Sequence, residues 1–226
     1  MSIPAPSDPG APTNEALLEL LGFTAYIRLG LFALISKHTY GAPGLRAAQR
    51  MATIGVRVGN QQQVLLDVAD RYGVDSFTLM RPFSGLFVDF EARTQESTWW
   101  EGVLKAVVGH GVAGDLARIL VQALPDDIRD DVSAALVHAD RDQDLRVTQM
   151  VAAAAQEDEE LAGRLSLWGR RVVGEALMLC RTALVTHPQL AGLARTVRPA
   201  DAGEHWLWEA LKAEHTARME RMGLAS

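Results

Sequence analysis

Proline spacing is the feature that most constrains the fold of this 226-residue chain. Beyond residue 40, prolines stand at positions 43, 82, 125, 188 and 199, and long proline-free segments with helical periodicity lie between them. A proline inside a helix removes a backbone hydrogen bond and clashes with the preceding turn, so each one predicts a boundary. No run of residues shows the period-two alternation typical of a strand, and no internal repeat is evident. The pattern predicts an all-α protein.

The periodic segments predict long helices at residues 14–37, 45–72, 98–124, 126–156 and 159–186. A short helix at 189–196 and an amphipathic helix at 201–222, with Asp201 as N-cap, are predicted to follow. Residues 73–97 are irregular and carry Phe77, Phe83, Phe87 and Phe90, which predicts a long crossover packed against the helices by its rings. Two helical hairpins joined by a long crossover have the connectivity of a ferritin-like bundle. We expect one domain at 14–222, with a four-helix core at 14–156 and appended helices at 157–222.

Composition and the N-terminal segment limit the cellular setting that we expect for the protein. The net charge of -6 argues against a nucleic-acid scaffold. Cys180 is the single cysteine, which excludes an intramolecular disulfide and predicts a reducing, cytoplasmic setting; its apolar neighbours predict a buried structural thiol. Residues 1–13 are rich in proline and are predicted to be disordered, and they lack the basic and apolar regions of a secretory signal.

Arg28 is the only charged residue between Leu20 and Ile35, in a segment that is apolar almost all round. The interrupted stretch falls short of the ~20 apolar residues that span a bilayer, so we expect a core helix and no membrane association. A helix apolar on every side is buried, which directs Arg28 inward. A buried guanidinium requires a partner; the alternative is that Arg28 extends to a bundle end and reaches water.

Other helices also bring polar groups to their apolar faces. Val58 and Gln61 lie three residues apart on the second helix. Asp140 and Gln143 repeat this spacing on the fourth. Asp115 is the likeliest inward acid of the third helix by its spacing from apolar neighbours, with His110 a little round from it, and Glu175 lies on the apolar stripe of the fifth helix. A polar layer in the middle of a bundle is how carboxylate-bridged metal sites are built.

The chain resembles actinobacterial ferritin-like proteins related to the tRNA hydroxylase that acts on 2-methylthio-isopentenyl-adenosine. The resemblance covers about residues 17–184. It is carried by LGFTAY at 21–26, by WEGVLKA at 100–106 with GHG at 109–111, and most specifically by LWGRRVVGEAL at 167–177. It implies a ferritin-like bundle and, in the enzymatic members, a non-haem di-iron centre that hydroxylates a modified tRNA base.

The resemblance also implies where metal ligands would lie in this chain. The family's ligand positions fall on Arg28, Val58, Gln61, His110, Asp115, Asp140 and Gln143. A glutamate is replaced by Arg28, and a Glu-x-x-His pair is replaced by Val58 and Gln61. Arginine cannot bind a cation, valine has no donor atom, and glutamine is a poor substitute for imidazole. This chain therefore departs from the metal pattern at most of its positions.

These departures predict a metal-free, non-catalytic protein with no cofactor and no catalytic residue, in which Arg28 pairs with Asp115, Asp140 or Glu175. The substrate or small-molecule ligand is not specified by the sequence. The alternative is a divergent di-iron hydroxylase built from His110, Asp115, Asp140 and Glu175. Iron storage would need still more ligands and is the least supported class.

Four further sequence patterns each allow two interpretations. Residues 109–114 match a dinucleotide fingerprint, but helical periodicity runs through them, so close helix packing is the simpler interpretation. His205, Glu209 and His215 could form an exposed metal site, although histidines on a solvated helix more often have no specific role. Trp206 and Trp208 predict either docking of the last helix on the bundle or a homodimer contact, and we expect a homodimer. Arg164, Arg170 and Arg171 are the place where tRNA would bind; ion pairs with Glu175 and the acids of 157–160 are the simpler interpretation.

Overall fold

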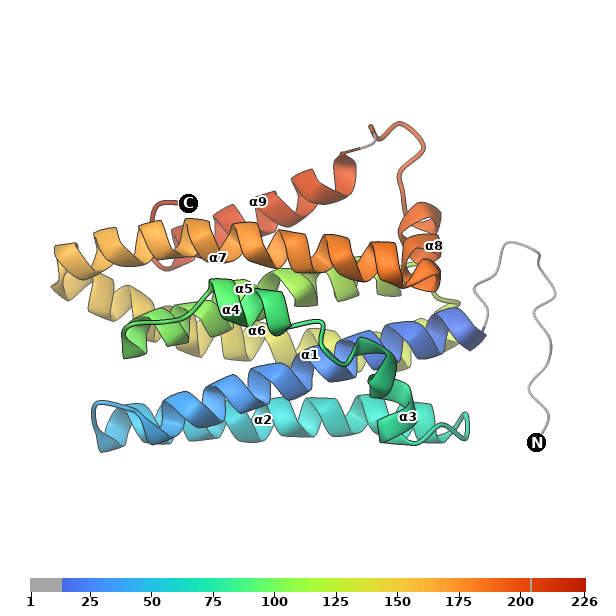
Figure 1. Cartoon of the computed structure of the whole chain (residues 1–226), viewed down its shortest axis with the longest axis horizontal. Helices are drawn as coiled ribbons and strands as arrows, with labels where there is room; N and C mark the ends of the chain where they lie inside the picture. Colours follow the sequence, from blue (N-terminus) through green and yellow to red (C-terminus); the bar gives the residue numbers. More distant parts are fainter. Residues whose placement is uncertain (1–13, 204) are drawn as a thin grey trace.

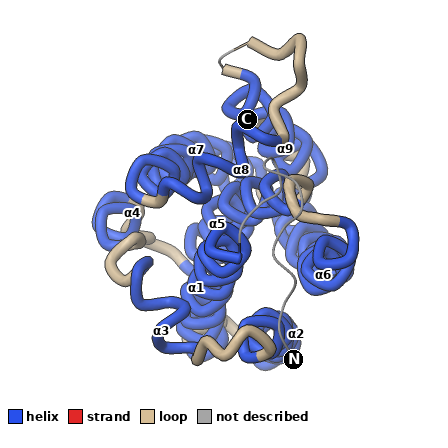
Figure 2. The backbone as a smooth tube through the Cα atoms, turned by 90° about the vertical axis from the view of Figure 1, so that its right-hand side faces the viewer, coloured by secondary structure: helices blue, strands red, loops and turns tan. Residues whose placement is uncertain are grey.

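The computed structural model describes residues 14–203 and 205–226, and within 126–157 it describes the backbone throughout but not the side chains of 127, 131 and 134–146. The predicted disordered segment 1–13 lies outside the described residues. In the described part of the chain every regular element is a helix (Figure 2). In chain order these are α1 (Asn14–Tyr40), α2 (Leu45–Asp70), α3 (Ser76–Met80), the 3-10 helix η1 (Arg81–Phe83), α4 (Val88–Arg93), α5 (Trp99–Val121), α6 (Asp126–Glu157), α7 (Glu159–Thr186), α8 (Pro188–Thr196) and α9 (Trp206–Arg221).

Four long helices form the core bundle. α1 packs against α2 and α5, and α6 packs against the same two helices. A short connection at 41–44 joins α1 to α2 in one hairpin, and another at 122–125 joins α5 to α6 in the second. The crossover at 71–98 runs back along the bundle between the hairpins, so that α2 and α5 point in the same direction (Figure 1). This is the connectivity of a ferritin-like bundle. The predicted all-α fold class is confirmed, with α7, α8 and α9 packed outside the four-helix core.

α5 lies in the middle of the molecule, with α1, α6, α7 and α9 packed around it (Figure 2). Every residue from 102 to 110 is buried, which explains why this helix is apolar all round. At Gly109, a Cβ atom would lie 2.4 Å from the ring of Phe90, so only glycine lets the crossover approach here. The glycines at 109–114 therefore belong to a continuous helix, as the packing interpretation predicted.

The aromatic side chains of the crossover pack as predicted, with one exception. Phe83 and Phe90 are buried, and the ring of Phe87 stacks on that of Tyr26 with 5.6 Å between centroids. Phe77, in contrast, is 69% exposed, so its predicted packing role is wrong. The carboxylate of Asp75 caps α3 by accepting hydrogen bonds from the first backbone N–H groups of the helix, and this short helix turns Leu79 inward and Phe77 outward.

Side-chain caps mark the starts of α3, α5 and α7, but not that of α9. Thr98 and Glu101 form a reciprocal capping box at the start of α5. The last helix begins at Trp206, later than predicted, and Asp201 is not its N-cap. Instead, the guanidinium of Arg198 donates hydrogen bonds to the Ala202 carbonyl and the Ala202 N–H bonds to Pro199, so this segment is a turn.

α1 has the length and hydropathy of a helix that could cross a membrane, and in the described part of the chain no other helix passes this test. The complete helix has 27 residues, longer than the apolar stretch identified in the sequence. However, 61% of its most apolar window is buried inside the fold. Packing in the bundle is sufficient to explain this composition.

Candidate functional site

The centre of the bundle holds a buried arginine beside a buried histidine. Arg28 of α1 is 4% exposed and His110 of α5 is 3% exposed, so Arg28 does not reach water. The His110 ring lies 5.1 Å from that of Phe87, within hydrogen-bonding reach of the Ile27 carbonyl. Burial, and then the positive charge of Arg28, lower the pKa of His110 to about 3. The imidazole is therefore neutral near pH 7.

α2 contributes two further side chains to the bundle interior. Val58 is fully buried and Gln61 is 7% exposed, as the apolar stripe of this helix predicts. Neither the Oε1 atom of Gln61 nor the Nδ1 atom of His110 has a hydrogen-bond partner among the described residues. The next residue, Gln62, points elsewhere and donates a hydrogen bond to the Ala25 carbonyl at 3.3 Å. The side chains of Asp140 and Gln143 lie outside the described residues.

Asp115 is buried, but on another side of α5. Its carboxylate accepts a hydrogen bond from Arg218 of α9 at 2.8 Å and another from Arg118. Five residues separate it from His110, which corresponds to a rotation of about 140° around the helix. Asp115 therefore joins α5 to α9, and its predicted pairing with Arg28 is wrong.

Glu175 also has a different partner from the one expected. Its side chain is 25% exposed on α7, and its carboxylate lies 3.9 Å from Arg93 at the end of α4. α7 packs against α4 and α5, outside the four-helix core. Glu175 therefore faces the crossover, and its predicted pairing with Arg28 is wrong as well.

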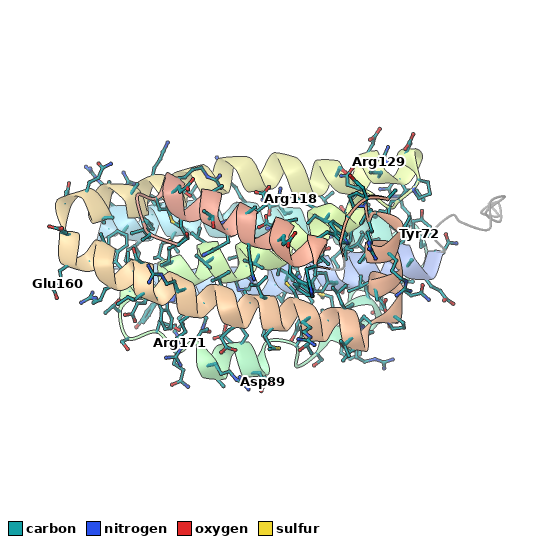
Figure 3. The ribbon with its side chains drawn as sticks, turned by 90° about the horizontal axis from the view of Figure 1, so that it is seen from above. Tyr72, Asp89, Arg118, Arg129, Glu160 and Arg171 are labelled. Carbon is teal, nitrogen blue, oxygen red and sulfur yellow. The ribbon has the colours of Figure 1, made fainter. Side chains whose placement is uncertain are left out.

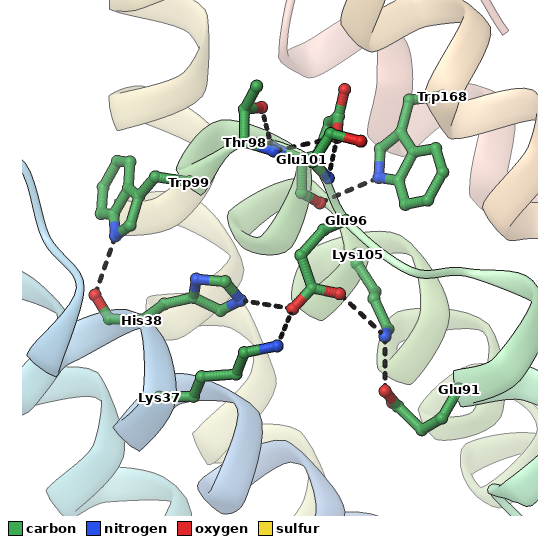
Figure 4. A network of polar contacts seen from close by, with 10 residues as sticks. Lys37, His38, Glu91, Glu96, Thr98, Trp99, Glu101, Lys105 and Trp168 are labelled. Carbon is green, nitrogen blue, oxygen red and sulfur yellow. Dashed lines mark hydrogen bonds and ion pairs between the residues drawn. The ribbon is translucent and has the colours of Figure 1, made fainter.

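A second polar cluster joins the end of the crossover to α1 and α5 (Figure 4). Lys105 of α5 has a fully buried side chain, and its Nζ atom lies 2.6 Å from Glu91 and 3.3 Å from Glu96. Glu96 also bonds Lys37 and lies 3.4 Å from the Nε2 atom of His38. We call these five residues the crossover network.

The charges of the crossover network are fixed by their neighbours. Burial by itself would raise the pKa of Glu96. This effect is outweighed by hydrogen bonds from Lys37 and from the backbone, together with the positive charge of Lys105, which lower the pKa to about 2. Burial lowers the pKa of His38, and the nearby carboxylate of Glu96 only partly offsets this effect. A carboxylate that stays ionised and shares two ammonium groups is suited to holding helices together, not to transferring protons.

The sequence analysis missed the crossover network. Lys105 stands between Leu104 and Ala106 on a helix apolar on every side, which is the same signal that identified Arg28. Its partners could not be identified, because Glu91 and Glu96 lie in a segment without helical periodicity.

Two of the basic residues singled out in α7, Arg170 and Arg171, are bound to the protein itself. The Nε atom of Arg171 donates to the Arg93 carbonyl at 2.9 Å, and Figure 3 shows Arg171 on the side of the molecule that also carries Asp89 of α4. Arg170 donates to the carbonyl of Ser226 at 3.3 Å. The predicted partners of these two arginines were carboxylates. The observed partners are backbone carbonyl oxygens. Beside them, Trp168 donates to the Glu101 carbonyl at 2.9 Å.

Of the remaining candidate groups, His215 and Cys180 are buried and Trp206 and Trp208 are half-buried, whereas His205 and Glu209 are exposed. Burial, followed by the charge of Arg218, lowers the pKa of His215 to about 4, and the side chain is 4% exposed, so it is not part of an exposed metal site with His205. Burial raises the pKa of the Cys180 thiol to about 12, which suits a structural role. Trp206 and Trp208 pack against the core, and α9 docks on α5 and α7.

The donor set that the structure describes at the bundle centre does not fit a di-iron site. Such sites use carboxylates and imidazoles projecting from all four helices. Among the side chains that the structure describes, no group of three or more His, Cys, Asp or Glu residues is placed to hold a metal ion. The described centre instead offers a guanidinium, a neutral amide and one imidazole, from Arg28, Gln61 and His110.

Comparison with known proteins identifies the family. The model of the ferritin-like domain of actinomycetes matches residues 11–196, which end with α8, so that α9 lies beyond the match. No curated protein matches the sequence. Because the match spans most of the chain and includes the four-helix core, this protein belongs to the ferritin-like domain family of actinomycetes.

Proposed function

We propose that this protein is a non-catalytic member of its family that works without a di-iron centre, in a binding or interaction role. The observation that carries the proposal is the burial of Arg28, at 4% exposure, in the interior where the family resemblance expects a metal-ligating glutamate. A guanidinium keeps its positive charge at any pH that the folded protein survives. It therefore supplies permanently the positive charge that metal ions would otherwise bring.

Electrostatics oppose a metal at this place. At the effective dielectric constant of a protein interior, a guanidinium about 4 Å from a metal ion would repel it by about 4 kcal/mol per unit of metal charge. Val58 has no donor atom and the amide of Gln61 is neutral, so neither offsets this repulsion. The charge of Arg28 already acts on His110, whose pKa it lowers.

The alternative, a divergent di-iron hydroxylase acting on a modified tRNA base or a small molecule, gains no support from the described residues. His110 faces α1 and the crossover, Asp115 contacts Arg218 of α9, and Glu175 faces Arg93 of α4. Ligands of one site must converge within about 2 Å of the metal. These three side chains lie on different sides of α5 or on its neighbour α7.

Metal analysis tests the proposal. Protein purified from iron-rich medium is expected to contain far less than one iron per chain and to show no iron charge-transfer absorption under air. Near-stoichiometric iron with such absorption would overturn it.

A gain-of-ligand variant provides a second arm of the test. R28E/Q61H restores a carboxylate and an imidazole in the bundle centre, and we expect it to bind more cobalt(II) than the unaltered protein. The matched control Q49H/R50E makes the same types of change nearer the start of α2, on side chains that are exposed. Circular dichroism would establish that both variants remain helical. Equal cobalt binding by the two variants would remove the reason for placing a former metal site at Arg28.

We also propose a homodimer and a cytoplasmic location, and neither proposal depends on the argument from Arg28. α9 docks on its own bundle with its two tryptophans half-buried, so the dimer does not follow from this helix. Analytical ultracentrifugation would decide it: a single species of twice the 24.6 kDa chain mass supports the dimer, and a monomer across micromolar concentrations excludes it.

A further inference from the structure

A pocket of about 310 Å³ lies between α2 and α6, and it shares no lining residue with either polar cluster. Its volume is at the lower end of the range for small-molecule sites. One side is apolar: Ile54 of α2 and Met150 of α6 are buried and form its floor. Polar side chains of Gln49, Thr53 and Gln149 line the rest, together with the guanidinium-bearing Arg50. The pocket therefore combines an apolar surface with a small number of convergent polar groups.

Among the described residues that line this pocket, the only charged side chain is positive, although the chain as a whole carries -6. Residues 45–66 of α2 include three arginines and no acid, and residues 147–156 of α6 include no charged residue. Arg50 has no ion-pair partner in the described part of the chain, and none of the residues lining the pocket is a carboxylate. Among the described residues that line the pocket, a ligand with a negative group would meet one cation and no carboxylate.

The neutral polar groups of the pocket can add hydrogen bonds to that contact. The Thr53 hydroxyl donates to the Gln49 carbonyl at 2.9 Å, which leaves its oxygen lone pairs as acceptors. The side-chain amides of Gln49 and Gln149 face the pocket from opposite helices, and each can donate or accept. Arginine binds a carboxylate with two parallel hydrogen bonds, a geometry that a neutral hydroxyl cannot match.

We propose that this pocket binds a small organic carboxylate, with its acid group on Arg50 and its apolar body against Ile54 and Met150. The proposal specifies the class of ligand for the binding role inferred above, but it does not depend on the absence of iron. Metal analysis and ligand titration can therefore fail independently of each other.

Octanoate is a suitable probe, because it joins one carboxylate to a flexible apolar chain, and 1-octanol is its neutral counterpart. Titrations of the full-length protein followed by calorimetry or NMR are expected to show saturable octanoate binding. The substitution R50Q removes the charge but keeps a polar side chain, and it is expected to weaken octanoate binding at least about tenfold. R46Q removes an exposed arginine of the same helix outside the pocket lining, and is expected to change binding less than about twofold.

Two further results make the test decisive. 1-Octanol is expected to bind about tenfold or more weakly than octanoate. Ala153→Phe, which fills the pocket from α6 without changing charge, is expected to abolish octanoate binding while circular dichroism stays unchanged. The proposal is overturned if octanoate shows no saturable binding, if R50Q binds it as well as the unaltered protein, if 1-octanol binds equally, or if a folded Ala153→Phe variant still binds.

Discussion

The bundle centre and the crossover network each bury a cation in an apolar helix, but they surround it differently. Lys105 meets two carboxylates within 3.3 Å, one of which is also shared with Lys37. In the bundle centre, by contrast, two buried polar atoms, Oε1 of Gln61 and Nδ1 of His110, have no hydrogen-bond partner among the described residues. Buried polar groups are normally satisfied, so each exception requires an explanation.

The difference indicates what each region is for. The crossover network has the properties of a structural clamp, because its charges are paired and its members come from segments that must be held together. The bundle centre holds buried polar atoms of Gln61 and His110 without described partners, which cost stability, whereas the network contributes stability. Substitutions and acidification are expected to affect the two regions to different extents.

Lys105→Met should be strongly destabilising. It leaves Glu96 buried with only part of its compensation, and removing one partner of a buried ion pair costs roughly 3 kcal/mol. Urea unfolding followed by circular dichroism would measure the loss. The matched control Lys37→Met removes a side chain that is 65% exposed from the same carboxylate, and should cost no more than about 1 kcal/mol. Equal losses for the two variants would mean that the network is not organised around the buried lysine.

Acidification should weaken the two regions in different pH windows. His110 has an ordinary pKa of 6.5 and a folded pKa of about 3. Between these values the unfolded chain binds more protons than the folded chain. The stability that His110 contributes is therefore complete above pH 6.5 and is lost as pH falls. From pH 6.5 to pH 5 this group should account for about 2 kcal/mol. Glu96, with its pKa lowered from 4.5 to about 2, contributes stability that is lost only below pH 4.5.

Unfolding curves of two variants across these windows would separate the contributions. His110→Gln should flatten the pH dependence of stability between 6.5 and 4.5, and Glu96→Gln should flatten it below 4.5. His38 and His215, whose pKa values are also lowered, act in the same direction as His110 and remain in both variants. An unchanged slope in His110→Gln would show that the pKa of this imidazole is the same in the folded and unfolded protein, contrary to its buried position.

Gln61→Met should raise stability by about 1 kcal/mol, because it removes a buried carbonyl oxygen without a hydrogen-bond partner and keeps the volume of the side chain. Thermal and urea unfolding would measure the gain. Gln62→Met is the matched control: it removes the hydrogen bond to the Ala25 carbonyl and should be neutral or slightly destabilising. If Gln61→Met were the more harmful change, the amide would have a structural role that its contacts do not reveal.

Parts of this architecture follow from short stretches of sequence. The proline positions and apolar periodicity predicted the long helices, with most ends within a few residues of those observed. The isolation of Arg28 in an apolar segment correctly indicated that it is buried. The predicted role of Phe77 failed because a local cap at Asp75 sets the orientation of a five-residue helix, which is too short to show a period.

The candidate site was less predictable, because its contacts join distant segments. The apolar stripe of α5 indicated that Asp115 is buried, but not which neighbour it faces. Its partner Arg218 is 103 residues away and lies on a helix whose start was also misplaced. Lys105 and its partners in the crossover present the same difficulty, because an irregular segment carries no pattern that aligns it with a helix.

Apolar spacing within each segment was enough to predict which segments are helical and which side of each is buried, because both properties depend on residues of one helix. The pairing of charges became known only from the packed fold, since it depends on how the helices are arranged around α5. An acid and a base on different helices are paired by the packing of apolar surfaces between them. Their partners can therefore be identified only once that packing is known.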